Sequence, residues 1–186
     1  MARHSARLLM LIAMAIAATA AAQERPALID AAKHADRARL RTLIQQNTDV
    51  NTAEADGTTA LHWAAYRDDA DSVQMLIRAG ARVNAATDLG ATPLWNASMN
   101  AGAGIVKQLL DAGANPNLAL LAGETPLMVA SRSGKADVVA LLLAKGADAN
   151  ARGSRRQTAL MWAVSQRHPE VEIGRASCRE RVCELV

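Results

Sequence analysis

TALHWAA at residues 59–65 recurs three times along the chain, as TPLWNAS at 92–98, TPLMVAS at 125–131 and TALMWAV at 158–164. The four leading threonines are evenly spaced, at positions 59, 92, 125 and 158. The same spacing relates three further sets of residues: Gly57, Gly90 and Gly123; Gly80, Gly113 and Gly146; and Asn51, Asn84, Asn117 and Asn150. A fixed period of roughly 20–50 residues indicates stacked structural repeats, each of which packs mainly against its neighbours.

Each unit is predicted to form two short helices. A threonine can cap a helix by accepting a hydrogen bond from an unpaired backbone N–H, and the proline that follows it in two units suits the first helical position. In the first helix of one unit, Leu61, Ala64 and Ala65 form an apolar stripe. A second helix carries Val, Leu and Ile at equivalent spacing and ends at a glycine such as Gly80, where a left-handed conformation is needed. Polar turns rich in Asn, Asp and Gly lead to the next threonine.

This pattern resembles the ankyrin repeat, a 33-residue unit with a Thr-Pro-Leu-His-x-Ala signature. The resemblance extends from about Pro26 to Val171 and gives about four and a half repeats. It implies an all-α solenoid of helix-turn-helix units joined by hairpin-like turns. It also implies that His62, at the signature histidine, helps to tie adjacent repeats together. Later units carry other residues at this position, namely Trp95, Met128 and Met161.

The repeat pattern changes at both ends of the predicted domain, which spans residues 23–171. In the first unit Asn47 replaces the helix-ending glycine, an exchange that the left-handed conformation tolerates. The second helix of this unit has a polar face suited to a water-exposed terminal repeat, formed by Arg37, Arg39 and Arg41. The fifth unit fails in its second helix, where the period demands apolar residues and a glycine but meets Glu172, Arg175 and Arg179.

An export signal is predicted at residues 1–22. Arg3 and Arg7 precede an apolar run, and small residues end at Ala22, where cleavage is expected. The alternative is an uncleaved membrane anchor, but the uncharged run is short for a bilayer core of about 30 Å. We therefore expect a periplasmic or secreted protein with no stable membrane insertion after cleavage. The periplasmic assignment assumes a bacterial source.

Residues 172–186 match nothing upstream and resemble the translation of a sequencing adapter, so we expect a non-native tail. Both cysteines, Cys178 and Cys183, lie in this tail and support neither a disulfide nor a metal site. Residues 23–171 carry 16 Lys and Arg against 15 Asp and Glu. This near balance gives no indication of a nucleic-acid or acidic-membrane partner.

No cluster of catalytic or metal-binding residues emerges from the sequence. The four histidines share no helix face, and Gly102-Ala103-Gly104 is predicted to be a turn between helices and not a phosphate loop. A solvated loop is expected at Asp68, Asp69 and Asp71, since calcium would need more oxygen ligands. We therefore predict a protein that is not an enzyme, with no cofactor, metal or small-molecule substrate.

A stripe of candidate partner-binding residues follows from helix geometry. With Leu61 and Ala64 toward the core, Trp63 and Tyr66 should lie together on the other side of their helix and be exposed. Steps of one repeat period extend the stripe to a set that resembles the positions ankyrin proteins vary to choose partners: Trp63, Tyr66, Asn96, Met99, Val129, Arg132, Trp162 and Ser165. Leucines at the turn tips extend it, at positions 118, 120 and 121. The alternative is that the tryptophans only cover alanines of neighbouring repeats.

The functional hypothesis is an exported scaffold that binds a protein partner through the concave face of the stack. Trp, Tyr and Arg, the side chains that most often dominate protein interfaces, all occur in the stripe. The rival hypothesis is a targeting module of a larger protein whose enzymatic or membrane domain is missing downstream.

Overall fold

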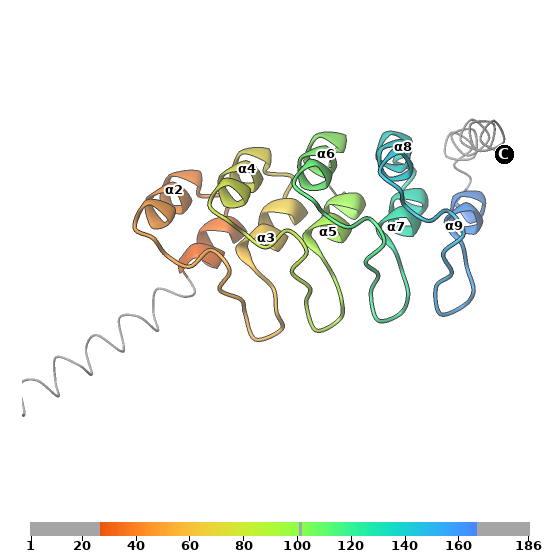
Figure 1. The fold of residues 1–186 in the computed structure, drawn as a ribbon, viewed down its shortest axis with the longest axis horizontal. Helices are drawn as coiled ribbons and strands as arrows, with labels where there is room; N and C mark the ends of the chain where they lie inside the picture. Colours follow the sequence, from red (N-terminus) through yellow and green to blue (C-terminus); the bar gives the residue numbers. More distant parts are fainter. Residues whose placement is uncertain (1–26, 101, 167–186) are drawn as a thin grey trace, which may run out of the picture.

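The computed structural model describes residues 27–100 and 102–166, so the predicted export signal at 1–22 and tail at 172–186 lie outside the described residues. Within the described ranges the regular elements are helices, with one isolated antiparallel bridge between Ala53 and Thr59. The helices form two rows, and long hairpin-like loops project from the side of one row (Figure 1). The all-α repeat solenoid predicted from the sequence is therefore confirmed.

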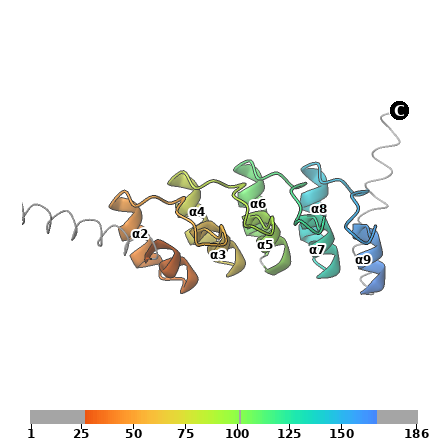
Figure 2. The same ribbon diagram turned by 90° about the horizontal axis from the view of Figure 1, so that it is seen from below.

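One helix of each repeat lies in each row. The inner row, next to the hairpins, contains α3 (Ala60–Tyr66), α5 (Pro93–Asn100), α7 (Pro126–Arg132) and α9 (Ala159–Ser165). The outer row contains α2 (Arg37–Gln45), α4 (Ala70–Arg78), α6 (Ala103–Asp111) and α8 (Ala136–Ala144). Each inner helix packs on the next, each outer helix does the same, and helical residues 27–33 precede α2 (Figure 2).

A single apolar core runs through the stack between the two rows. The equivalent leucines Leu76, Leu109 and Leu142 are fully buried on the outer helices, as the repeat register predicts. The alanines of the inner helices are buried as well, at positions 64, 97, 130 and 163. Their small side chains allow close approach of neighbouring helices, while the burial of each leucine depends on the adjacent repeat.

The predicted helix starts and stops are confirmed. The Thr125 hydroxyl accepts a hydrogen bond from the Met128 N–H at 3.3 Å, and the Thr92 hydroxyl accepts one from the Trp95 N–H at 3.2 Å. After the outer helices, the backbone turns left-handed at Asn47, with φ +58°, as the sequence predicts for this exchange. The turn predicted at Gly102-Ala103-Gly104 is only partly correct, because Gly102 caps α6 while Ala103 and Gly104 already belong to that helix.

The hairpins of successive repeats approach each other closely. The Leu121 N–H donates to the Leu89 carbonyl at 2.9 Å, and the equivalent contact joins Asp88 to Asp56 at 2.9 Å. At Gly90 the φ angle is +84°, and a Cβ atom would lie 2.9 Å from the Ala119 carbonyl oxygen. This set of glycines is therefore needed both for the turn and for the contact with the next hairpin.

The asparagine set bridges successive repeats in a way that the period alone did not reveal. The Asn84 side chain donates to the Gly113 carbonyl at 3.0 Å and accepts from the Asn115 N–H at 2.8 Å. Equivalent pairs of bonds are made by Asn51 and Asn117. Each amide thus pairs backbone groups that follow the next outer helix and fixes the spacing between units.

One expectation at the start of the stack is wrong. Asp69 is only 3% exposed, and it caps α4 by accepting hydrogen bonds from the Ser72 N–H and hydroxyl at 3.3 and 2.6 Å. Arg37 donates from Nε to the same carboxylate at 2.8 Å, because α2 and α4 are neighbours. Burial alone would raise the pKa of Asp69, but the bonds from Ser72 and Arg37 outweigh it and leave that pKa below its usual value. Asp69 is therefore not in a solvated loop. Arg37 is exposed, as predicted, and also links two repeats.

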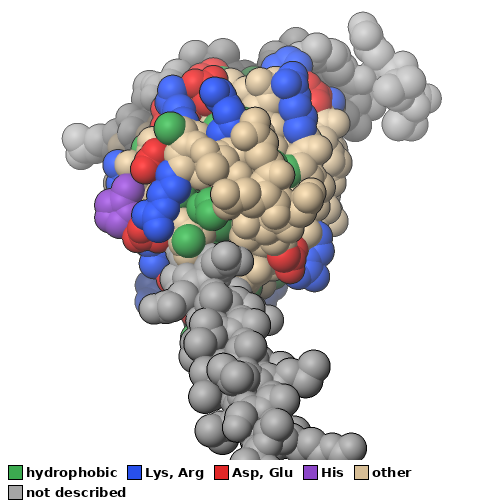
Figure 3. Space-filling view, turned by 90° about the vertical axis from the view of Figure 1, so that its left-hand side faces the viewer, with side chains coloured by type: hydrophobic (Ala, Val, Ile, Leu, Met, Phe, Trp, Pro, Cys, Tyr) green, Lys and Arg blue, Asp and Glu red, His purple; other side chains and the backbone are tan. Residues whose placement is uncertain are grey.

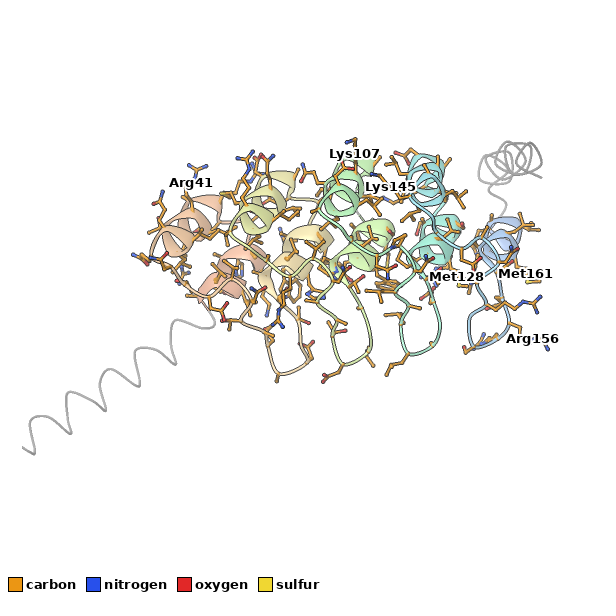
Figure 4. The ribbon with its side chains drawn as sticks, viewed as in Figure 1. Arg41, Lys107, Met128, Lys145, Arg156 and Met161 are labelled. Atoms are coloured by element: carbon orange, nitrogen blue, oxygen red, sulfur yellow. The ribbon has the colours of Figure 1, made fainter. Side chains whose placement is uncertain are left out.

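The outer helices carry ion pairs on the side away from the hairpins. Lys107 and Lys145 both donate to the carboxylate of Asp111, at 2.6 and 2.9 Å, and lower its pKa to about 2. Figure 4 shows these two lysines and Arg41 along the outer row. Basic and acidic side chains are also mixed on the N-terminal end of the stack (Figure 3). The visible surface there has no large region of a single charge sign.

Candidate functional site

A groove lies between the hairpins and the inner helices. One hollow in it has a volume of about 350 Å³. The hairpins contribute Asp56, Thr58, Thr87 and Ala91 to its lining, and the inner helices contribute His62, Trp63, Tyr66 and Asn96. Three of the eight predicted stripe residues, Trp63, Tyr66 and Asn96, therefore share one hollow that faces the hairpins.

We define the N-terminal cluster as Lys33, Glu54, Trp63 and Tyr66. The Trp63 and Tyr66 rings meet edge to face, with centroids 6.0 Å apart and an interplanar angle of 85°. Glu54 accepts hydrogen bonds from the Trp63 indole N–H at 2.9 Å and from the Lys33 ammonium at 2.6 Å. The same ammonium lies 4.8 Å from the centre of the Trp63 ring. These contacts leave Trp63 half-buried, whereas we expected it to be exposed, and Tyr66 is 46% exposed.

We define the C-terminal cluster as Glu124, Arg132 and Trp162. The Arg132 guanidinium forms an ion pair with Glu124 and lies 5.2 Å from the centre of the Trp162 ring. Trp162 is half-buried, and the neighbouring Ser165 is exposed and donates to the Trp162 carbonyl at 2.9 Å. The far end of the stripe thus has the same three chemical components: a cation, a carboxylate and a tryptophan.

The middle of the stripe does not have the expected character. Val129 is fully buried, which contradicts its prediction as a surface contact. Val129 lies on α7, which packs between α5 and α9. Asn96 is half-buried and directs its amide toward the His62 carbonyl at 3.4 Å, and Met99 is also half-buried. The stripe is therefore two separate clusters and not one continuous patch.

His62 lies in the lining of the hollow and bonds to the backbone of two repeats. It is fully buried, and its Nδ1 accepts a hydrogen bond from the Thr59 N–H at 3.1 Å. The ring proton must then lie on Nε2, which donates to the Ala91 carbonyl of the next repeat at 3.0 Å. Burial lowers the pKa of His62, so the ring is neutral near pH 7. The predicted link between adjacent repeats is confirmed here.

Comparison with protein families agrees with this geometry. A family model described as ankyrin repeats in three copies matches residues 28–120 and again 94–172. The two matches together cover more than half of the chain. This chain belongs to the ankyrin repeat family. Ankyrin repeats are generally protein–protein interaction modules. A search of curated proteins found no match to the chain.

Several groove residues of this ankyrin stack were missed by the sequence analysis. Lys33 could have been found, because it lies one repeat period before Tyr66. Arg132, which was predicted, lies two periods after Tyr66. Glu54 and Glu124 could not, because neither recurs at the repeat spacing.

The hairpin tips carry a second missed feature. Leu89 is 69% exposed and contacts the tip that holds Leu121, which is 80% exposed. Of the leucines predicted there, Leu121 is exposed, whereas Leu118 and Leu120 are half-buried.

The described part of the ankyrin stack has few other features of a chemical site. No group of three His, Cys, Asp or Glu side chains within residues 27–100 and 102–166 is placed to hold a metal ion. No helix in those ranges is long and apolar enough to cross a membrane. The groove, with its clusters at both ends, is the feature best suited to recognition.

Proposed function

We propose that this ankyrin domain is an exported scaffold that binds a protein partner in the groove between its hairpins and inner helices, on the concave face of the stack. The observation that carries the proposal is the pair of clusters, in each of which a cation covers a tryptophan and pairs with a carboxylate. Both clusters lie on the same side of the inner helices, three repeats apart.

The clusters are suited to binding because their side chains are already held in place. Trp63 has its indole N–H bonded to Glu54, and Arg132 is fixed between Glu124 and the Trp162 ring. A side chain that is ordered before binding loses less conformational entropy when a partner arrives. Trp, Tyr and Arg also supply most of the strong contacts in protein interfaces. A repeat solenoid presents such residues along an extended surface.

Export is supported by the order of charge, apolar run and small residues at 1–22. Determination of the mature N-terminus after expression in a bacterial host tests it. A mature chain that begins at Gln23 supports a periplasmic or secreted scaffold, whereas an intact Met1 on a membrane-bound protein supports an anchor.

The alternative is that the stack serves as the targeting module of a larger protein. Met161 and Val164 of α9 are 56% and 55% exposed, whereas the equivalent Met128 and Ser131 of α7 are buried. This apolar edge favours further folded sequence against α9. The gene sequence beyond the codon for Val171 distinguishes the two proposals.

Substitution of the groove tests the scaffold proposal. The variant W63A/Y66A/R132A should lose capture of its partner from an envelope extract, as identified by cross-linking and mass spectrometry. Its melting temperature should fall by only a few degrees, because the three side chains lie at the edge of the core. The matched control R41A/Q74A/R78A, on exposed positions of α2 and α4, should retain capture. Equal capture by both variants would refute the groove as the binding surface.

A further inference from the structure

We infer that the hollow beside Tyr66 accepts a basic side chain, arginine or lysine, from the protein partner. This inference rests on the proposed function and specifies the chemistry of one contact. The hollow, about 350 Å³ in volume, is large enough for one long side chain and opens between two hairpins and two inner helices.

The charge of the hollow favours a cation. Asp56 is the acidic residue in its lining, and no lysine or arginine of the described chain lines it. The N–H and hydroxyl of Thr58 each donate to the Asp56 carboxylate at 2.9 Å, and they lower the pKa of Asp56. His62, in the same lining, is neutral. The hollow therefore presents one fixed negative charge at neutral pH.

The repeat geometry identifies what a cation would contact. Lys33 lies over Trp63, and Arg132 lies over Trp162, and each cation precedes its tryptophan by the same interval along the chain. One repeat period on from Lys33 and Trp63, the equivalent pair is Tyr66 with Asn96, and both line the hollow. Tyr66 thus places an aromatic ring at the position where each cluster has its cation. No lysine or arginine from residues 27–100 or 102–166 covers the Tyr66 ring.

A basic side chain from the partner would complete this arrangement. Its charge would face Asp56 and the Tyr66 ring, and its apolar stem would lie along the aromatic edge. An aliphatic side chain would remove water from the Asp56 carboxylate without pairing it, which is unfavourable. An acidic side chain would meet Asp56 and, beyond Trp63, Glu54. Arg67 follows Tyr66 but does not line the hollow.

Selection from a random peptide library displayed on phage tests the inference without knowledge of the natural partner. Peptides are selected on the folded chain and then sorted by their dependence on the groove, using W63A/Y66A/R132A. We expect the groove-dependent peptides to share an arginine or lysine. Replacement of that residue by citrulline or norleucine should weaken binding about five- to thirty-fold, the range of a partly desolvated cation–aromatic contact.

Single substitutions locate the contact. D56N and Y66L should each weaken the basic peptide about five-fold or more and should leave the neutral peptide unchanged. The matched control D88N removes an exposed hairpin aspartate outside the hollow and should have no effect. Groove-dependent peptides that lack a basic residue, or that ignore D56N, would overturn this inference alone. A library that yields only peptides insensitive to W63A/Y66A/R132A, or no binder, would overturn the proposed function as well.

Discussion

The N-terminal and C-terminal clusters place a cation over a tryptophan in the same way, but they draw their carboxylates from different repeats. Lys33 and Arg132 occupy equivalent positions, as do Trp63 and Trp162, so the repeat period encodes the cation–ring pair. Glu54 lies in the hairpin that leads to the tryptophan, whereas Glu124 lies in the hairpin that leads to the arginine. The repeat period therefore fixes where the tryptophan ring and the cation meet. The carboxylate that pairs with the cation comes from a different hairpin in each cluster.

The two clusters also differ in what lies beneath them. Trp63 follows His62, which joins two repeats through hydrogen bonds at both ring nitrogens. At the equivalent position the repeat of Arg132 has Met128, which is buried, and the repeat of Trp162 has Met161, which is 56% exposed, so neither has a titratable group there. The N-terminal half of the groove should therefore respond to pH, and the C-terminal half should not.

The largest expected effect tests whether the two clusters stand on equivalent repeats. Leu76 and Leu142 are fully buried at the same repeat position of α4 and α8, and L76A and L142A should each lower the free energy of unfolding by about 2–5 kcal/mol. Urea unfolding followed by circular dichroism measures both. A loss below about 0.5 kcal/mol at either position would refute the equivalence of the two repeats.

A smaller effect separates the halves by pH. Because the folded pKa of His62 lies below its unfolded value near 6.5, the unfolded chain binds more protons at acid pH. This contribution to stability is present above about pH 6.5 and is lost as the pH falls below it, with a slope of at most about 1.4 kcal/mol per pH unit. The variant H62M, which copies Met128, should unfold with a flatter pH profile between pH 7 and 5, as measured by urea titration at each pH. An unchanged pH profile in H62M would show that His62 does not cause the loss of stability at acid pH.

The smallest expected effect compares the two carboxylates. E54A should lower the free energy of unfolding by about 1 kcal/mol, because Glu54 bonds both Lys33 and the Trp63 indole. E124A should lower it by about half as much, since Glu124 makes one partly exposed ion pair. Both losses should shrink at high salt, since the ion pairs are partly exposed. Urea unfolding at low and high salt, followed by circular dichroism, checks the order. The reverse order would mean that the indole hydrogen bond contributes little.

The sequence by itself determined the repeat, most helix boundaries and the side of α3 that carries Trp63 and Tyr66. These features depend on contacts within one unit, such as the Thr125 cap, or on a period that every unit repeats, such as Leu109 and Leu142. Local hydrogen bonds and helix geometry act over a few residues, so a single sequence carries enough information to specify them. The binding role of the eight stripe residues stays a prediction.

Only the tertiary structure decided which side chains from different repeats meet. In the structure Val129 is buried, and Asp69 caps a helix and binds Arg37 where a solvated loop was predicted. Glu54 contacts both Lys33 and Trp63. The tertiary structure also gave the asparagine set its role between units. Each of these contacts joins residues outside a common helix, and its geometry depends on how far one repeat is displaced and rotated from the next. The repeat period specifies that neighbours stack, but the spacing between them arises only when both are folded.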